Sequence, residues 1–175
     1  MHPIIYDVAV SLDGFIAEAS GDVSKFTFEG PVVDDYQHRM AAYRTAIMGR
    51  LAYEFAYQFG LQPGQNPYKH MRTIVFSKTL ECPLNREIEV CPDIDMATVE
   101  DLKATAKGPI YLCGGGTFSG ALLKMGAIDV VRLKRTPIVL GGGVNLFGKT
   151  CDTARLRCRE VKLYDSGHVL ETLTP

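Results

Sequence analysis

Three consecutive glycines are the residues of this chain that most clearly suggest ligand chemistry. Gly114, Gly115 and Gly116, followed by Thr117, stand between apolar runs at residues 110–113 and 118–125. This order predicts a buried strand, a bare turn and a helix. Without Cβ atoms in the turn, the N–H groups at the start of the helix can approach an anion such as a pyrophosphate. Alternatively, the glycines serve only to let the helix pack closely on the sheet.

A second glycine-containing motif points to a different class of protein. Residues 143–150 match G-x-x-x-x-G-K-[ST], the phosphate-binding P-loop, in which Lys149 and Thr150 would reach phosphate and magnesium. A P-loop lysine opens a helix, but the residues after Asp152 alternate in polarity as a strand does. We therefore favour a chance match in a glycine-rich turn, and keep a P-loop nucleotide hydrolase as the alternative.

Two short basic segments follow predicted strands. Gly49 and Arg50 stand where a strand at residues 45–48 meets a helix at 51–59, so backbone N–H groups and a guanidinium can meet a phosphate together. The second segment, Ser77-Lys78-Thr79, follows a strand at residues 73–76 and supplies hydroxyls and an ammonium group. Read without a ligand, they are an ordinary surface arginine and an ordinary polar turn.

The overall composition predicts a protein that binds a small molecule. The 175 residues include 19 Lys and Arg and 20 Asp and Glu, a formal charge of -1, which gives no reason to expect a nucleic-acid or membrane partner. The five cysteines form no C-x-x-C pair, and the four histidines are scattered, so we expect reduced thiols and no metal site. No apolar stretch reaches the roughly 18 residues of a membrane-spanning helix, and the start lacks the basic residues of a signal peptide, which predicts a cytoplasmic protein.

Strand-like and helix-like segments alternate, which favours an α/β sheet with helices on its faces. Further predicted strands lie at residues 4–10, 88–90 and 109–113, and further helices at 32–43, 96–106 and 118–125, the second of these capped by Asp95 or Thr98. After Gly126 we expect strands at 128–134, 138–140, 156–164 and 168–173, with residues 165–167 as a hairpin turn. The end of the chain should therefore add antiparallel strands.

Several segments together resemble one family. They are VAVSLDGFIA at residues 8–17, IMGRLAYE at 47–54, VFSKTL at 75–80, the glycine triplet, and Asp129 followed by PIVLGGGVNLF at 137–147. In this order they resemble the dihydrofolate-reductase-like family, above all the C-terminal reductase domain of riboflavin biosynthesis and its stand-alone relatives. The resemblance covers nearly the whole chain. It implies a single domain over residues 1–175 with a three-layer α/β fold: a mixed, mainly parallel sheet with antiparallel C-terminal strands. It also implies that residues 143–150 are a turn after a late strand.

The resemblance implies an NADPH-dependent reductase that passes a hydride to a small planar C=N or C=O group. It assigns Arg50 to the 2′-phosphate, and cations in both basic segments favour NADPH over NADH. The nicotinamide carboxamide would be held by backbone groups near Ala9, and residues 18–30 would form a loop that closes over the ring. The cofactor-binding residues implied are Ala9, Ile16, Ala17, Gly49, Arg50, Ser77, Lys78, Thr79, Gly114, Gly115, Gly116 and Thr117.

Catalytic residues are harder to assign. Asp13 and Asp34 are the weak candidates, but Asp13 precedes Gly14 in a turn and is expected to bond to backbone, while Asp34 opens a helix, where an acid favours the dipole. Asp34 also lies near the place of the pterin-binding carboxylate of dihydrofolate reductases. The chain has no Trp, so that family's Trp-bearing loop is missing and folate is not the expected substrate. Reduction of a ribosylaminopyrimidine, and cofactor binding without turnover, remain open.

We also expect a homodimer joined through the C-terminal sheet. Residues 138–140 and 144–147 present more apolar surface than the last strands of a small domain need. Dimers are what the resemblance to the riboflavin-type reductases implies. The alternative is that these residues pack on the chain's own core.

Overall fold

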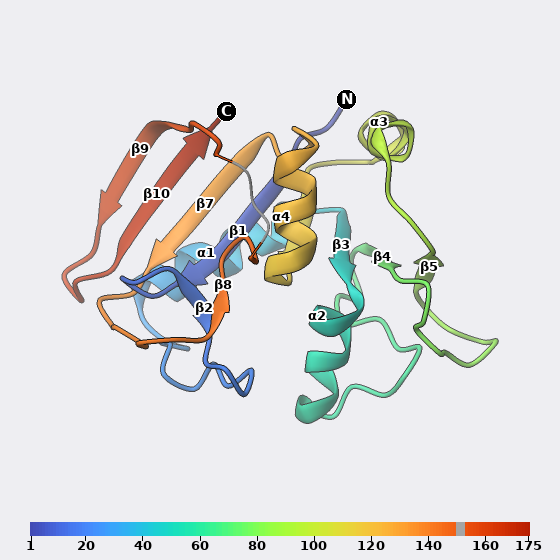
Figure 1. Cartoon of the computed structure of the whole chain (residues 1–175), viewed down its shortest axis with the longest axis horizontal. Coiled ribbons are helices and arrows are strands. Elements are labelled where there is room, and N and C mark those ends of the chain that lie inside the picture. Colours follow the sequence, from blue (N-terminus) through green and yellow to red (C-terminus); the bar gives the residue numbers. More distant parts are fainter. Residues whose placement is uncertain (150–152) are drawn as a thin grey trace.

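The computed structural model describes residues 1–149 and 153–175, and its centre is one eight-stranded sheet (Figure 1). The strand order is β5-β4-β3-β6-β1-β7-β10-β9. The strands are β1 (Ile4–Val10), β3 (Thr45–Gly49), β4 (Arg72–Phe76), β5 (Glu89–Cys91), β6 (Ile110–Gly114), β7 (Val130–Arg135), β9 (Arg157–Leu163) and β10 (Val169–Thr174). The six strands from β5 to β7 in this order are parallel, whereas β10 is antiparallel to both β7 and β9. The predicted mixed sheet with antiparallel C-terminal strands is confirmed.

A second, two-stranded sheet was not expected from the sequence. It pairs β2 (Phe15–Ala17) with β8 (Val144–Asn145). The strand predicted at residues 138–140 is wrong: Pro137 stands two residues after the end of β7, and the Leu140 N–H donates to the Asp13 carboxylate instead of to a neighbouring strand. This apolar run is therefore a connection tied to the β1–β2 turn.

Helices cover both faces of the sheet, as predicted. The face that carries Ile5 and Tyr111 is covered by α1 (Pro31–Ala42) and α2 (Arg50–Phe55), and the face that carries Ile4 and Leu112 by α3 (Met96–Thr105) and α4 (Gly116–Lys124). The expected helix at residues 51–59 is in fact α2 followed by the 3-10 helix η1 (Ala56–Phe59). Asp95 caps α3 by accepting the Thr98 N–H at 2.8 Å, a bond that satisfies one of the free donors of the first turn.

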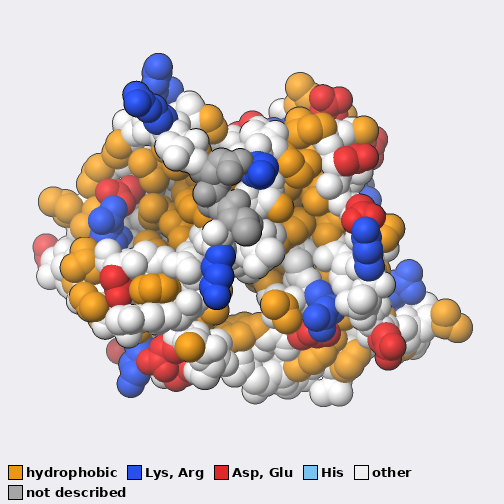
Figure 2. All heavy atoms as spheres, in the orientation of Figure 1, with side chains coloured by type: hydrophobic (Ala, Val, Ile, Leu, Met, Phe, Trp, Pro, Cys, Tyr) orange, Lys and Arg blue, Asp and Glu red, His pale blue; other side chains and the backbone are white. Residues whose placement is uncertain are grey.

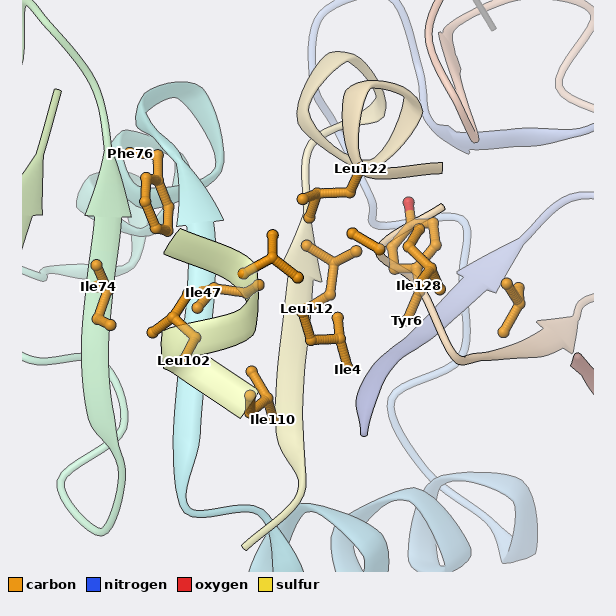
Figure 3. Close-up of a cluster of buried hydrophobic side chains, with 13 residues drawn as sticks. Ile4, Tyr6, Ile47, Ile74, Phe76, Leu102, Ile110, Leu112, Leu122 and Ile128 are labelled. Atoms are coloured by element: carbon orange, nitrogen blue, oxygen red, sulfur yellow. The ribbon is translucent and has the colours of Figure 1, made fainter. Parts of the chain in front are cut away.

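The core follows from side-chain alternation along the strands. In β1, Ile4 and Tyr6 point to the face of α3 and α4, where they meet Leu112, Leu122 and Ile128 (Figure 3). Successive residues of a strand point to opposite faces, so Ile5 and Asp7 lie under α1. Full burial of a large apolar side chain stabilises the fold by about 1.5–3 kcal/mol. The polar groups buried on the first face, such as the hydroxyls of Tyr6 and Ser119, are uncharged, whereas the second face receives a buried charge, Asp7, which is 1% exposed.

Segment 143–149 lies directly against α4. A Cβ atom on Gly116 would stand 2.1 Å from the Asn145 carbonyl oxygen, and one on Gly120 would stand 2.1 Å from that of Phe147. The Leu146 carbonyl oxygen accepts hydrogen bonds from the hydroxyls of Tyr6 at 3.1 Å and Ser119 at 3.0 Å. The helix can approach this segment so closely only because two of its residues lack a side chain.

Replacing Gly120 by Ala should destabilise the fold by about 1–3 kcal/mol, because the new methyl group would displace the backbone at Phe147. Alanine within a helix otherwise gains roughly 1 kcal/mol over glycine, so a loss identifies the steric contact. Urea unfolding measures the difference. Gly142→Ala is the matched control, since a Cβ atom added at Gly142 would have nothing within 4 Å; equal stabilities of the two variants would contradict this account of the packing.

Candidate functional site

The residues assigned to the cofactor meet at the carboxyl edge of the parallel strands. Gly49 at the end of β3 is in register with Phe76 at the end of β4, and Met48 is in register with Gly114 at the end of β6. The glycine turn, Gly49–Arg50 and the residues after Phe76 are thus neighbours along one edge. In open parallel sheets this is the edge at which ligands bind.

The glycine turn has a packing role and also leaves donors open. Gly114 and Gly115 have φ values of 113° and 83°, which residues with a side chain rarely adopt. Gly116 is required by its contact with Asn145. No side chain caps the start of α4, so the N–H groups of its first turn remain available to an anion. The packing interpretation of the triplet therefore holds for Gly116, while anion binding at the start of α4 stays a prediction.

A hollow opens beside this turn. Figure 2 shows it between the β2–β8 side of the molecule and the α2 side, below the first turn of α4. The loop after β2 reaches across to α2, where Gly21 lies against the ring of Phe55. Ala52 of α2 lies against the glycine turn, since a Cβ on Gly115 would be 3.7 Å from the Ala52 methyl group. Lysine or arginine side chains and apolar side chains lie beside the hollow in Figure 2, a mixture that suits a flat molecule with charged groups.

The predicted phosphate ligands lie at this edge with partners of their own. The Arg50 guanidinium is 40% exposed and forms an ion pair with Glu54 at 2.9 Å, and exposed Lys78 pairs with Asp93 at 2.9 Å. The Ser77 hydroxyl accepts the N–H groups of Thr79 and Leu80, so it shapes the turn. Exposed ion pairs of this kind are weak, which means that a phosphate can compete for both cations.

A shallow depression adjoins the second basic segment. Its volume is about 300 Å³, and it lies between the ends of β4 and β5. It is lined by Ser77, Lys78, Leu80, Cys82, Arg86, Val90 and Pro92. Apolar side chains and two cations are a suitable lining for an aromatic base with phosphate nearby.

The residues assigned to the nicotinamide lie at the other end of the hollow. Ile16 and buried Ala17 belong to β2, which is held by β8, and the Leu146 N–H donates to the Gly14 carbonyl oxygen at 3.1 Å. Ala9 lies near the end of β1. Segment 143–149 thus contacts the nicotinamide end through β2 and the phosphate end through α4.

The two carboxylate candidates for catalysis, Asp13 and Asp34, have different surroundings. Asp13 accepts hydrogen bonds from the Ser11 hydroxyl and from the N–H groups of Leu140 and Gly141. The Ser11 bond is the main cause of the lowered pKa of Asp13. Asp13 therefore holds two loops together, as its turn position suggested. Asp34 is exposed in the first turn of α1, where its backbone N–H donates to the Gly30 carbonyl oxygen at 3.0 Å and its own carbonyl oxygen lies 2.8 Å from His38 Nδ1.

Sequence reasoning missed a polar cluster under α1. Lys134 of β7 is in register with Ala9, and its Nζ lies 3.2 Å from the centroid of the Tyr36 ring of α1. The Tyr36 hydroxyl lies 2.8 Å from that of Tyr111, and the Tyr68 hydroxyl lies 3.2 Å from the Cys113 sulfur. Burial lowers the pKa of Lys134 to about 8 and raises the pKa of the Cys113 thiol. The available signal was the spacing in β7, where basic residues stand at alternating positions, 132 and 134.

The buried carboxylate of this cluster is already paired. Asp7 accepts from Arg39 of α1 at 2.6 Å and from the Tyr43 hydroxyl at 3.3 Å, and Arg132 donates to the same tyrosine at 3.3 Å. A buried charge is tolerated when it is paired and hydrogen-bonded in this way. Asp7 is therefore engaged in holding α1 on the sheet.

The structure does not support the P-loop interpretation. Residues 144–149 form β8 and turns, so Lys149 does not open a helix; Thr150, with Cys151, lies outside the described residues. Within residues 1–149 and 153–175, no cluster of side chains suited to a metal ion occurs and no helix is long and apolar enough to span a membrane. The cysteines at 82, 91, 113 and 158 are free thiols.

A mainly parallel sheet with antiparallel final strands, and a glycine turn at its carboxyl edge, defines the class as the dihydrofolate-reductase-like fold. Within it, the chain belongs to the RibD C-terminal domain family, which matches residues 3–170. It is 28% identical over 158 residues to the uncharacterized protein YwjB of Bacillus subtilis (strain 168), covering 90% of this chain and 89% of that one. A putative riboflavin biosynthesis protein from Shewanella sp. PV-4 has a similar structure, with a TM-score of 0.81, 25% identity, and coverage of 99% of this chain and 98% of its own.

Two reductases share the fold at lower identity. One is the Thermotoga maritima diaminohydroxyphosphoribosylaminopyrimidine deaminase/5-amino-6-(5-phosphoribosylamino)uracil reductase, with a TM-score of 0.70, 18% identity, and coverage of 99% of this chain and 56% of that one. The other is dihydrofolate reductase from Enterococcus faecalis complexed with NADP(H), with a TM-score of 0.69, 15% identity, and coverage of 98% and 95%. Together with the family, these relatives support an oxidoreductase.

Replacing Lys134 by Met should raise the free energy of unfolding at pH 7 by about 1–2 kcal/mol. Burial lowers the pKa of Lys134 from 10.5 to about 8, so the folded state disfavours the ammonium form that the unfolded chain carries. The gain is largest below pH 8 and shrinks as the pH rises towards 10.5, where the lysine is neutral in both states. Denaturant unfolding at pH 7 and pH 10 tests this; a variant less stable than the parent at pH 7 would contradict it.

The matched control for this comparison is Lys162→Met. The Lys162 side chain is 51% exposed and forms an ion pair with Asp35. Its removal should change the stability little at either pH.

Proposed function

We propose that this protein is an NADPH-dependent reductase that transfers a hydride to a small planar C=N or C=O substrate. One observation carries the proposal: the glycine turn, the two basic segments and Ala9 lie along one edge of the sheet, beside one hollow. NADPH is an extended molecule with phosphates near one end and a flat ring at the other. The order of these groups along the edge suits that molecule.

The chain's residues fit the cofactor from end to end. Lys78 and Arg50 would hold the 2′-phosphate end, with the depression beside Ser77 for the adenine. The open N–H groups at the start of α4 would hold the pyrophosphate. Backbone groups of Ala9, Ile16 and Ala17 would hold the carboxamide, because the small Ala side chains let the ring come close. NADP(H) binds to the Enterococcus relative of the same fold.

The acceptor would lie beside Ala9 and under α1, where the tyrosine cluster provides flat apolar walls. Folate-type recognition of an aminopyrimidine needs a free carboxylate, but the Asp7 carboxylate here is occupied by Arg39 and Tyr43. Together Asp7, Arg39, Arg132 and Lys134 bring one negative and three positive charges to this face of the sheet. We therefore favour an acceptor with carbonyl or anionic groups, such as a pyrimidinedione or oxidised pteridine, over dihydrofolate.

In this mechanism the main contribution of the protein is to orient the cofactor and the acceptor. When bound, the dihydronicotinamide supplies the hydride. Residues of β2 and Ala9 would hold the ring and leave one of its faces open to the acceptor, and residues 18–30 would exclude water. Positioning of this kind, with a developing negative charge facing cations, lowers the barrier without a covalent intermediate.

NADPH should raise the melting temperature of the protein more than NADH does at equal concentration, since only NADPH carries the extra phosphate. Arg50→Ala should weaken NADPH binding by about 1.5–3 kcal/mol and change NADH binding little. Isothermal titration calorimetry measures the binding of NADPH and of NADH to the parent protein and to the variant. Equal shifts with the two cofactors would contradict the proposed specificity.

A matched arginine serves as the control in this titration. Arg44 precedes β3, whereas Arg50 follows it, so Arg44→Ala removes the same charge at the opposite edge of the sheet. It should leave NADPH binding unchanged. The P-loop alternative predicts instead that ATP with magnesium stabilises the protein and that Lys149→Ala abolishes this effect.

Turnover separates a reductase from a protein that only binds the cofactor. We would test turnover by following NADPH oxidation at 340 nm. The acceptors would be a panel of 7,8-dihydropterin, oxidised pteridines and aminopyrimidinediones. Stabilisation by NADPH without oxidation by any acceptor would favour the binding protein.

We also propose a homodimer, joined at β9. The strand is the free edge of the main sheet, and Val161 and Leu163 are 53% and 74% exposed. Unpaired edge strands with apolar side chains favour pairing with another chain. Of the residues expected to supply apolar surface, Leu146 and Phe147 pack on the chain's own core, whereas Val139 is 67% exposed.

Size-exclusion chromatography with light scattering should give twice the 19.3 kDa mass of the chain. Leu163→Glu should shift the mass towards the monomer, because a two-fold axis brings the new carboxylates close together. Leu84→Glu is the control, since Leu84 is 98% exposed in a loop. A monomeric parent protein at micromolar concentration would refute the dimer.

A further inference from the structure

Lys134 occupies a special position in the proposed site. Parallel β1 and β7 place its Cα beside that of Ala9, on the face of the sheet covered by α1. Its ammonium nitrogen lies 3.2 Å from the centre of the Tyr36 ring. Lys134 thus stands next to the backbone assigned to the nicotinamide, on the side where an acceptor would lie.

The surroundings of Lys134 leave its ammonium group without an acidic partner. From β1 it faces Asp7, which is bonded to Arg39 and Tyr43; from α1 it faces Arg39 and Tyr36. Its own strand adds Arg132, which bonds Tyr43, and its neighbour on β10 is the uncharged Leu170. Among residues 1–149 and 153–175, no hydrogen bond or ion pair engages the Lys134 Nζ atom, whereas the Tyr36 ring holds it in place.

We propose that Lys134 is the proton donor of the reduction and acts on the nitrogen or oxygen of the acceptor's C=N or C=O bond. This inference rests on the proposed reductase function. The side chain is partly exposed, so the ammonium group can touch a molecule bound under α1. The Tyr36 ring stabilises the cation without taking its proton.

The proton and electron balance is simple. The acceptor carbon gains the hydride as a new C–H bond, and the π electrons of the C=N or C=O bond move to the heteroatom. An N–H bond of Lys134 breaks, its proton forms the new N–H or O–H bond, and the amine is left neutral. Water then returns a proton to the amine, and the nicotinamide leaves in its oxidised form.

The titration of Lys134 suits this role. Burial lowers its pKa to about 8, so the group is charged at neutral pH and still gives up its proton readily. The active form is the ammonium, which dominates below pH 8. The acid-dependent rate should therefore fall as the pH rises through about 8.

The position of Lys134 also limits the substrate class. The heteroatom that receives the proton must face α1 and β7, with the carbon that receives the hydride against Ala9. A protonated, cationic C=N group would meet like charges from Lys134, Arg39 and Arg132. The acceptor class is therefore a neutral or anionic planar heterocycle.

The first test reads the lysine itself and needs no substrate. In protein labelled with 13Cε-lysine, the Lys134 resonance is assigned by its loss in Lys134→Met and should titrate near pH 8. NADPH should shift it, whereas 2′,5′-ADP, which lacks the nicotinamide, should shift Lys78 but not Lys134. The Lys162 resonance, assigned through Lys162→Met, should respond to neither ligand.

The outcomes separate the two proposals. A shift of Lys78 with NADPH but none of Lys134, or a Lys134 pKa above 10, overturns the proton-donor assignment and leaves the cofactor site standing. No shift of any lysine with NADPH overturns the proposed function, and the assignment with it.

The second test is kinetic and uses the acceptor from the panel that the parent protein reduces fastest. Lys134→Met should lower kcat about 100-fold or more while the Kd for NADPH stays unchanged. Lys134→Arg keeps the charge but not a titratable proton, so it should be slow and lose the fall in rate near pH 8. Unchanged kcat and pH profile in Lys134→Met would overturn the proposal.

Discussion

The contact between segment 143–149 and helix α4 is the constraint on which the site depends. The segment lies so close to the helix that side chains are excluded at Gly116 and Gly120, and the Leu146 carbonyl oxygen is fixed by two hydroxyls, one from the sheet and one from the helix. The same segment supplies β8, which holds β2. Because both ends of the proposed cofactor groove are attached to one stretch of backbone, the distance between the nicotinamide walls and the pyrophosphate turn is set by packing and not by loop conformation. A flat ligand gains from such a groove, since little ordering remains to be done when it binds.

The face of the sheet under α1 is organised by buried charge, and not by close backbone packing. Its centre is a buried ion pair, Asp7 with Arg39, supported by the Tyr43 hydroxyl. Such pairs contribute little net stability, but removing one partner is costly, so they fix how an element is placed. Here the pair fixes α1 above β1 and occupies the only carboxylate of the cluster around Lys134 among the described residues. The groups that this face can offer to a ligand are cations and aromatic rings, and this distinguishes it from a site that binds an aminopyrimidine through a carboxylate.

The sequence predicts well the sheet and the segments that meet at its carboxyl edge, because their signals are local. Apolar runs followed by glycine or by Gly49-Arg50 mark strand ends, and parallel strands bring such ends together whatever their separation in sequence. The polar cluster under α1 could not be predicted in this way. Whether Lys134 faces Ala9 depends on the register of β1 and β7, whose paired residues are more than a hundred positions apart. The false P-loop fails for a related reason: its glycines serve a tertiary contact with α4 and with Ala17, which no local motif describes. The expected strand at residues 138–140 fails because the Leu140 N–H donates to Asp13 and the Ile138 N–H donates to the Thr136 carbonyl oxygen, so neither pairs with a strand.

A lysine held over a tyrosine ring without an acid is a poor choice for stability alone. Methionine would fill the same space without the cost of taking an ammonium group out of water, and the neighbouring Asp7 pair does not need Lys134, because Arg39 and Tyr43 already satisfy its carboxylate. The cation–π contact returns only part of that cost. Strained or poorly solvated groups that persist beside a ligand groove are characteristic of functional sites, where stability is given up for reactivity. The position next to Ala9 gives a reason under the proposed function: a proton would be needed where the hydride arrives, and a partly buried amine can both give one up and regain it from water at neutral pH.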